Sequence, residues 1–193
     1  MKTVFFDIDT QIDFVYPAGA LYVPGAEHLI DKIASLNRHA AKTGAPLVST
    51  MDAHRENDEE FRNWPAHCVA GTVGQQKPAA TLLPTRLVIP PSDWAERIDG
   101  FEQLILEKRH LDCFTNPNLE GLLMAFDADR YIVYGVVTEI CVKLAAFGLL
   151  DRGKHVEIVE DAVGSLDRAK ADAMFAEFKA RGGVITRHSA VVT

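Results

Sequence analysis

Hydrophobic and polar positions along the chain follow two alternating patterns. Short runs of apolar and β-branched residues are separated by longer segments in which apolar residues recur with the period of a helix. Buried parallel strands show the first pattern, and helices that cover a sheet show the second. The sequence therefore predicts the α/β class, with three layers in the order helix, sheet, helix and an open, mostly parallel, Rossmann-like sheet of six strands.

The predicted elements follow one another through most of the chain. Strands are expected at 3–8, 46–50, 103–107, 130–135, 155–159 and 184–186, and 86–89 is either a short strand or an extended segment. Helices are expected at 26–43, 118–126, 139–152 and 167–181. No repeat or linker composition interrupts the series, so we expect residues 1–193 to form a single domain.

The segment 51–85 lacks the periodicity of the rest of the chain and is rich in acids, glycine and proline. A long stretch without regular elements inside a compact domain is usually functional. We therefore expect the 51–85 loop to carry part of a site.

Net charge and cysteine content limit the partners and the compartment. A net charge of −7 disfavours binding to nucleic acid. No apolar run approaches the roughly 18 residues that span a bilayer, so a membrane partner is not expected. Three cysteines without C-x-x-C spacing, Cys68, Cys113 and Cys141, argue against a disulfide framework and predict a reducing, cytoplasmic location. The expected partner is a small molecule, and a homo-oligomer is left open.

Ionisable and nucleophilic residues follow four of the predicted strands. In an open α/β sheet, ligands bind beyond the carboxyl ends of the strands. The residues at these ends are Asp7 and Asp9, then Asp52 and His54, then Lys108, and finally Thr138 and Cys141. The sequence therefore predicts an active site at this edge of the sheet.

Cys141 is the candidate nucleophile. Thr138 is expected to cap the helix that follows, which places Cys141 in the first helical turn. A helix N-terminus lowers the pKa of a thiol and offers N–H groups to an oxyanion. A free cysteine is most often a small buried core residue, but Lys108 and an acid at neighbouring strand ends favour the nucleophile. Cys68 and Cys113 are expected to be buried thiols without a chemical role.

The 51–85 loop contains candidate metal ligands. Asp52 and His54 stand at D-x-H spacing, and His67 lies in the sequence WPAHC. Mixed nitrogen and oxygen ligands suit Zn, Fe(II) or Mn. Such residues in a polar loop are commonly just solvated, but Trp64 beside His67 makes simple solvation less favourable.

These residues also carry a family resemblance. DTQIDF, D-x-H, WPAHC, a lone lysine after the fourth extended segment and GVVTEICV together resemble the nicotinamidase branch of the isochorismatase-like cysteine hydrolases. The resemblance implies a catalytic triad of Asp9, Lys108 and Cys141. It further implies a cis peptide bond between Val136 and Val137, with the Val137 and Cys141 amides forming an oxyanion hole.

The same resemblance implies a cofactor and a reaction. One divalent transition metal, zinc in the first place with Fe or Mn as alternatives, would be held by Asp52, His54, His67 and a fourth ligand. Glu60 is our choice because it stands seven residues before His67, with Asp58 and Glu59 as competitors. Phe14 and Trp64 match the aromatic residues that flank a pyridine ring. The implied reaction, a step of NAD salvage, converts nicotinamide and water to nicotinate and ammonia through a cysteine thioester.

The sequence after Lys108 departs from the family pattern. Typical nicotinamidases continue with a glycine and a tyrosine-containing turn, whereas this chain reads KRHLDCFTN. Phe114 is expected to supply the missing wall of the ring site. Another small amide or a vinyl ether therefore stays an alternative substrate.

A different enzyme class competes for the first strand. VFFDIDT fits the signature of Mg²⁺-dependent haloacid-dehalogenase-type phosphatases, with Asp7 as nucleophile and Asp9 as acid. Lys108 and the acidic pair Glu160 and Asp161 would complete that site. The phosphatase hypothesis leaves the metal-ligand candidates, Trp64 and Cys141 without a role, and it takes second place.

Overall fold

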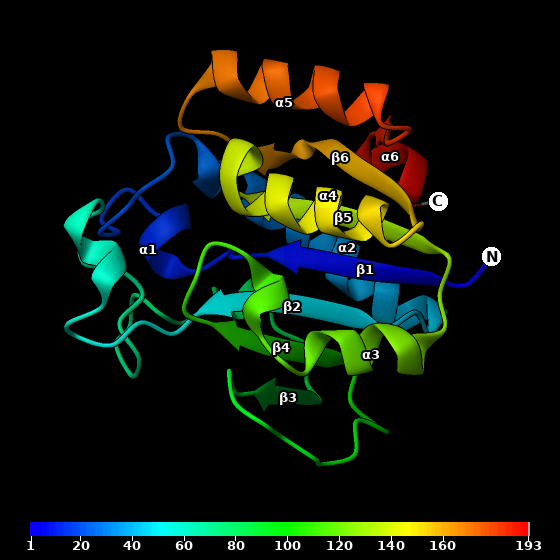
Figure 1. The fold of residues 1–193 in the computed structure, drawn as a ribbon, viewed down its shortest axis with the longest axis horizontal. Helices are drawn as coiled ribbons and strands as arrows, with labels where there is room; N and C mark the ends of the chain where they lie inside the picture. The colour runs from blue at the N-terminus through cyan, green and yellow to red at the C-terminus, as the bar shows by residue number, and fades with distance from the viewer. Residues whose placement is uncertain (193) are drawn as a thin grey trace.

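A computed structural model describes residues 1–192, and its centre is a parallel sheet (Figure 1). The strands are β1 (Thr3–Ile8), β2 (Leu47–Asp52), β3 (Arg86–Ile89), β4 (Gln103–Lys108), β5 (Arg130–Val136), β6 (His155–Gly164) and β7 (Val184–Thr186). They form a 7-stranded sheet in the order β3-β4-β2-β1-β5-β6-β7, and each neighbouring pair is parallel. The predicted α/β class is confirmed.

The sheet has seven strands rather than the predicted six. The ambiguous segment 86–89 is β3, which pairs in parallel with β4 at the edge of the sheet. Only Ile89 of this strand is buried, so its four residues carry too little hydrophobic pattern to decide between a strand and an extended segment. The strand predicted at 155–159 also continues to Gly164, past a register shift in its pairing with β5.

Helices cover both faces of the sheet. The structure contains α1 (Ile12–Val15), α2 (Ile30–Thr43), α3 (Leu119–Phe126), α4 (Lys143–Asp151), α5 (Arg168–Ala180) and α6 (His188–Val191). Helices α3 and α4 lie in front of the sheet in Figure 1, α5 runs along the top above β6, and α2 lies behind the sheet. Helix α5 packs on the same side as α4, where Phe178 stacks on Phe147. α2 ends where the sequence predicts, because Gly44 adopts the left-handed conformation, with φ of 70°.

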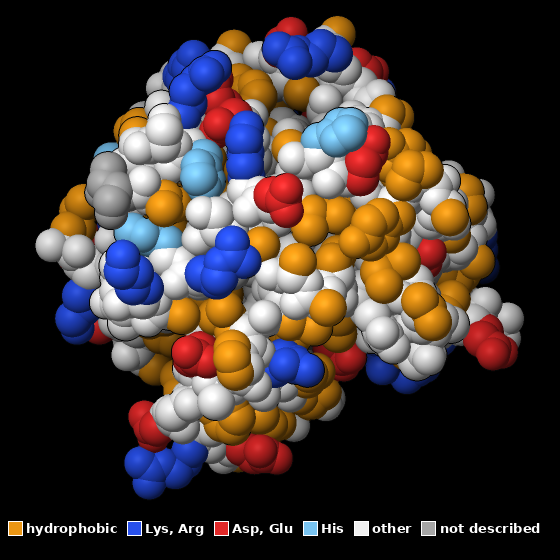
Figure 2. Space-filling view, turned by 180° about the vertical axis from the view of Figure 1, so that it is seen from behind, with side chains coloured by type: hydrophobic (Ala, Val, Ile, Leu, Met, Phe, Trp, Pro, Cys, Tyr) orange, Lys and Arg blue, Asp and Glu red, His pale blue; other side chains and the backbone are white. Residues whose placement is uncertain are grey.

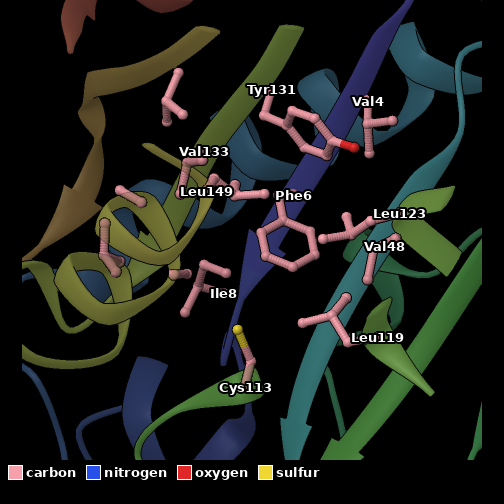
Figure 3. Close-up of a cluster of buried hydrophobic side chains, with 14 of the residues drawn as sticks. Val4, Phe6, Ile8, Val48, Cys113, Leu119, Leu123, Tyr131, Val133 and Leu149 are labelled. Carbon is pink, nitrogen blue, oxygen red and sulfur yellow. The ribbon is translucent and has the colours of Figure 1, made fainter. Parts of the chain in front are cut away.

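Strand alternation divides the core between the two faces. Val4, Phe6 and Ile8 of β1 pack against Leu119 and Leu123 of α3 and other apolar side chains (Figure 3). Phe5 belongs instead to the cluster on the side of α2. Each fully buried side chain of this size contributes about 1.5–3 kcal/mol, so the two clusters together set the register of the central strands.

The carboxyl ends of β1, β2 and β4 point toward α1 and the 51–85 loop, at the left of Figure 1. The face of the molecule that carries α2, seen from behind in Figure 2, bears acidic, basic and hydrophobic side chains intermixed. Among residues 1–192, no helix has both the length and the apolar character needed to cross a membrane.

Gly135 of β5 provides a test of this packing. Its φ is +117°, and an added Cβ would lie 2.1 Å from the backbone oxygen of Ile8. We expect Gly135→Ala to lower the free energy of unfolding by about 1–3 kcal/mol or more. Urea unfolding measures the change.

Gly121→Ala in α3 is the matched control. A Cβ at Gly121 would meet nothing within 4 Å, so this change should raise stability by about 0.5–1 kcal/mol. A Gly135→Ala variant as stable as the natural protein would contradict the close approach of β1 and β5.

Candidate active site

Asp9 directly follows β1 and is held in an unusual conformation by Thr50. The φ of Asp9 is 47°, in the left-handed region that few non-glycine residues adopt. The Asp9 N–H donates to Thr50 Oγ1 over 3.1 Å, and that hydroxyl donates to Asp9 Oδ1 over 2.6 Å. The second carboxylate oxygen, Oδ2, lies 2.9 Å from Lys108 Nζ. Thr50 therefore fixes which oxygen of Asp9 faces the lysine.

Lys108 is the last residue of β4 and is fully buried between two carboxylates. Its Nζ lies 2.5 Å from Asp52 Oδ1 and 2.9 Å from Asp9 Oδ2, and it donates to the His110 carbonyl over 3.1 Å. Burial lowers the pKa of Lys108, but Asp52 and Asp9 together raise it well above its usual value. Burial also raises the pKa of Asp52, to about 6, against the opposing effect of Lys108.

Cys141 lies in a π-helical turn, Thr138–Val142, between β5 and α4. Its Sγ is 3.9 Å from Lys108 Nζ. Burial raises the pKa of the Cys141 thiol well above its usual value; Lys108 lowers that pKa and Asp9 raises it again. The net shift of this pKa is therefore upward, because burial and the carboxylates outweigh the effect of Lys108.

The residues around Cys141 differ in one detail from the sequence prediction. Thr138 makes no capping hydrogen bond to the helix; its hydroxyl donates to the Gly164 carbonyl over 2.8 Å and ties the turn to the end of β6. The peptide bond between Val136 and Val137 is cis, as the resemblance implies. Val137 and Cys141 both line the pocket described below.

The candidate metal ligands meet at the ends of β1 and β2. One ligand atom each from Asp52, His54 and His67 lies within 4.8 Å of the others, and all three residues are buried. Glu60 Oε1 lies 3.9 Å from His54 Nε2 and 3.8 Å from His67 Nε2. These four residues thus surround one point.

The other two candidates for the fourth ligand lie elsewhere. Asp58 Oδ2 is 3.1 Å from His54 Nδ1, on the opposite side of the ring from Nε2. The Glu59 side chain is 86% exposed and lies near Arg62. The geometry therefore favours Glu60, and it places Asp58 where it can orient His54.

The donor set fits a divalent transition metal. Within residues 1–192, the buried His54 Nε2 has no hydrogen-bond partner, although it faces two carboxylates and a second imidazole. A buried polar atom without a partner is costly, and a metal ion at this point would satisfy it. Two imidazoles with two carboxylates form a ligand set that zinc accepts.

A small pocket joins the reactive groups to the metal ligands. Its charged or reactive lining consists of Asp9, Asp52, Glu60, His67 and Cys141. The rest of the lining is apolar and consists of Phe14, Leu21, Trp64, Leu111, Val136, Val137, Ile140 and Leu166. The Phe14 ring lies 5.3 Å from the His67 ring. The pocket therefore presents the Cys141 thiol and the candidate metal ligands to one small, largely apolar space.

Comparison with known proteins places the chain in a family. A family model described as "Isochorismatase domain" matches residues 3–190. The chain belongs to the isochorismatase family. Among curated proteins, the nicotinamidase of Escherichia coli is 23% identical to it over 201 residues, which cover 92% of this chain and 91% of the relative.

Two solved structures of family relatives are similar throughout their length. The pyrazinamidase of Pyrococcus horikoshii, in complex with zinc, has a TM-score of 0.82 and 28% identity, with 97% of this chain and 99% of that chain covered. PnC1 from L. infantum, in complex with nicotinate, has a TM-score of 0.78 and 28% identity, with coverage of 98% and 94%.

The structure corrects the expected third wall of the pocket. Phe114 does not line the pocket; its ring stacks under the Arg152 guanidinium at 3.8 Å and packs against Gly148. Leu111 lines the pocket instead. The resemblance predicts an aromatic residue in this turn, whereas an aliphatic residue three positions after Lys108 carries no comparable signal in the sequence. The pocket residues Leu21, Ile140 and Leu166 were missed for the same reason.

The phosphatase hypothesis is wrong for this chain, which belongs to the isochorismatase family. Asp7, its candidate nucleophile, is fully buried and does not line the pocket. The candidate Mg²⁺ ligands are engaged elsewhere, Glu160 with Arg187 and Asp161 with Lys32.

The burial of the three thiols predicts their order of reaction. Cys68 and Cys113 are 0% and 3% exposed and lie outside the pocket, whereas Cys141 lines it. We expect iodoacetamide to modify Cys141 first in the folded protein. The reaction should be slower than that of a free thiol at pH 7 and should accelerate as the pH rises, because a raised pKa leaves less thiolate.

Peptide mass mapping after graded exposure to the reagent identifies the modified thiol. Cys141→Ser is the matched control and should remove the first phase of modification. Earlier labelling of Cys68 or Cys113 would contradict the assignment of Cys141 as the thiol that faces the pocket.

Proposed function

We propose that this member of the isochorismatase family is an amidohydrolase that converts nicotinamide and water to nicotinate and ammonia. The observation that carries the proposal is the convergence of Cys141, Lys108 and Asp9 with a metal-ligand group in one small pocket. Relatives that are a nicotinamidase and a pyrazinamidase, and one solved with nicotinate, support a pyridine-type amide as substrate.

Asp9 acts as the base in the first half of the reaction. Because its pKa is raised, the Cys141 thiol holds its proton until Asp9 accepts it. The Cys141 sulfur attacks the amide carbonyl, and Lys108 stabilises the negative charge shared by the sulfur and Asp9. The oxyanion accepts hydrogen bonds from the Val137 and Cys141 amides, each of which is worth about 2.7–4 kcal/mol in sites of this kind.

The second half of the reaction returns every group to its starting state. Asp9 gives its proton to the amide nitrogen, the C–N bond breaks, and ammonia leaves a thioester on Cys141. A water molecule, deprotonated by Asp9, then attacks the thioester carbonyl. The C–S bond breaks, nicotinate leaves, and the proton returns to the Cys141 sulfur.

The metal-ligand group positions the substrate. Asp52, His54, His67 and Glu60 would hold one divalent metal, zinc in the first place, which supplies a Lewis acid for the ring nitrogen when it is bound. The Phe14 and Trp64 side chains line the same pocket and would enclose the pyridine ring. The ring is thereby held with its amide toward Cys141.

The charges of the pocket favour a neutral amide over other substrates of small-molecule hydrolases. Asp9, Asp52 and Glu60 are among its lining residues, and the nearby cation, Lys108, is already paired with two carboxylates. Among residues 1–192, no arginine or lysine lines this pocket. A substrate that carries carboxylates, such as isochorismate or maleamate, would bring its charge beside these acids, with only the proposed metal as a cation that is not already paired with a carboxylate side chain outside its ligand set.

Activity of the purified protein tests the proposal. We expect release of ammonia from nicotinamide, and we expect Cys141→Ala to lower kcat by more than about a thousandfold because the nucleophile is lost. Cys113→Ala is the matched control, since that thiol lies in the core outside the pocket, and it should keep kcat.

Turnover of other candidate substrates separates the alternatives, measured as ammonia release from maleamate and as pyruvate release from isochorismate, which has no amide nitrogen. For maleamate and isochorismate we expect kcat/KM at least about a hundredfold below that for nicotinamide. Turnover of nicotinamide by Cys141→Ala would overturn the nucleophile assignment. A preference for either carboxylated compound would overturn the proposed substrate and favour the alternative of another small amide or a vinyl ether.

Metal binding gives an independent test. We expect about one zinc per chain, lost in His54→Ala, and we expect Asp58→Asn to weaken zinc binding by about 10–100-fold because it no longer orients His54. Elemental analysis and competition with a chromophoric chelator measure both effects. Glu59→Gln removes an exposed neighbouring carboxylate and should leave zinc affinity unchanged. Full zinc occupancy in His54→Ala would contradict the ligand set.

A further inference from the structure

A second buried lysine lies close to the site and takes no part in the proposed reaction. The Lys77 and Asp7 side chains are 1% and 0% exposed, and Lys77 Nζ lies 3.3 Å from Asp7 Oδ2. Neither residue lines the pocket. We propose that Lys77 is a positioning residue that couples the 51–85 loop, with its metal ligands, to the turn that carries Asp9.

Asp7 occupies a position that the strand pattern assigns to a hydrophobic residue. It lies in the middle of the apolar run of β1, two residues after Phe5 and therefore on the same face of the sheet. A buried carboxylate is unfavourable unless it is paired, and an apolar pair of similar volume is often at least as stable as a buried ion pair. Stability alone therefore does not account for Asp7 and Lys77.

The hydrogen bonds of the pair connect two separate segments. Asp7 Oδ1 accepts from Thr10 Oγ1 over 2.8 Å, and Asp7 Oδ2 accepts from Ser49 Oγ over 3.0 Å. Lys77 Nζ donates to Thr10 Oγ1 over 2.9 Å. Thr10 is the neighbour of Asp9 in the chain. The Lys77 ammonium group thus joins residues 74–77, the returning limb of the 51–85 loop, to the turn after β1.

The residues before Lys77 carry this constraint along the loop. The carbonyls of Gly74 and Gln76 accept from the N–H groups of Asp13 and Ile12, over 3.1 and 2.8 Å. The Gln75 carbonyl accepts from the side chain of Gln11 over 2.9 Å. The returning limb is therefore aligned residue by residue with the segment that follows Asp9.

Asp13 extends the connection to a metal ligand. Its Oδ2 accepts from the Cys68 N–H over 2.7 Å, and Cys68 directly follows His67. Its carboxylate also fits against Gly74, where a Cβ would lie 2.1 Å from Oδ2. Without the Lys77 charge, the Asp7 carboxylate has no ion-pair partner in the core. The returning limb, which contacts Asp13 and through it the backbone next to His67, then loses its ion pair with the turn after β1.

Hydrogen exchange and zinc affinity together test this role. We expect Lys77→Met to speed exchange of the amides in 66–77 at least about tenfold over natural protein and to weaken zinc binding at least about tenfold. The matched control is Arg130→Met, which breaks the Arg130–Glu157 ion pair at the other end of β5. That variant should lose stability in urea while the exchange of 66–77 and the zinc affinity stay unchanged.

A double variant, Asp7→Leu with Lys77→Met, removes both charges and keeps the test valid if the single variant fails to fold. We expect the double variant to recover stability in urea but to keep the fast exchange of 66–77 and the weak zinc binding. Natural exchange and zinc affinity in the double variant, or equal acceleration over the whole sheet in Lys77→Met, would overturn the proposal. Lys77 would then only compensate a buried charge.

The zinc measurement rests on the proposed metal site, but the exchange measurement does not. If the natural protein binds no zinc, the proposed cofactor is wrong. The exchange rates of 66–77 in Lys77→Met and in Arg130→Met still decide whether Lys77 holds the loop.

Discussion

The site depends on one buried cation, Lys108, held between Asp9 and Asp52. Two buried carboxylates this close to one another do not both stay ionised without a positive charge between them. The sheet supplies the geometry, because Asp52 and Lys108 are register partners in β2 and β4. Core packing on both faces of the sheet therefore sets the distance between the proposed base and the metal-ligand group. The proposed chemistry needs both groups, since Asp9 activates the Cys141 thiol and the metal-ligand group orients the pyridine ring.

Much of this arrangement could be predicted from the sequence because it follows from position along a strand. Asp9, Lys108 and Cys141 each come at or just after the carboxyl end of a predicted strand, and parallel strands bring those ends together. The D-x-H spacing of Asp52 and His54 and the aromatic neighbour of His67 likewise predicted the group that the structure brings together. Hydrophobic runs long enough to show a period predicted the four longer helices, α2 to α5, and the inner strands, whereas the four-residue helices α1 and α6 were not predicted.

The rest depends on three-dimensional contacts that leave no periodic signal. The edge strand β3 is too short to show the alternating pattern of a strand. The raised pKa of Cys141 reflects burial by residues distant in sequence. The hydrogen bond from Thr50 to Asp9 joins residues 41 positions apart in the chain, and the ion pair of Lys77 with Asp7 joins residues 70 positions apart. Leu111 lines the pocket where an aromatic residue was expected, and the Phe114 ring instead stacks with the Arg152 guanidinium. Pairing partners of this kind become visible only in the folded chain.

In the proposed reaction, Cys141 forms a thioester with the acyl part of nicotinamide. Rapid acid quenching of the protein during turnover, followed by mass spectrometry of its peptides, tests that claim directly, because thioesters survive in acid. We expect a single nicotinoyl group on the peptide that contains Cys141, present during turnover and gone once the substrate is consumed. Turnover without an adduct at any time, or an adduct on Cys68 or Cys113, would contradict it.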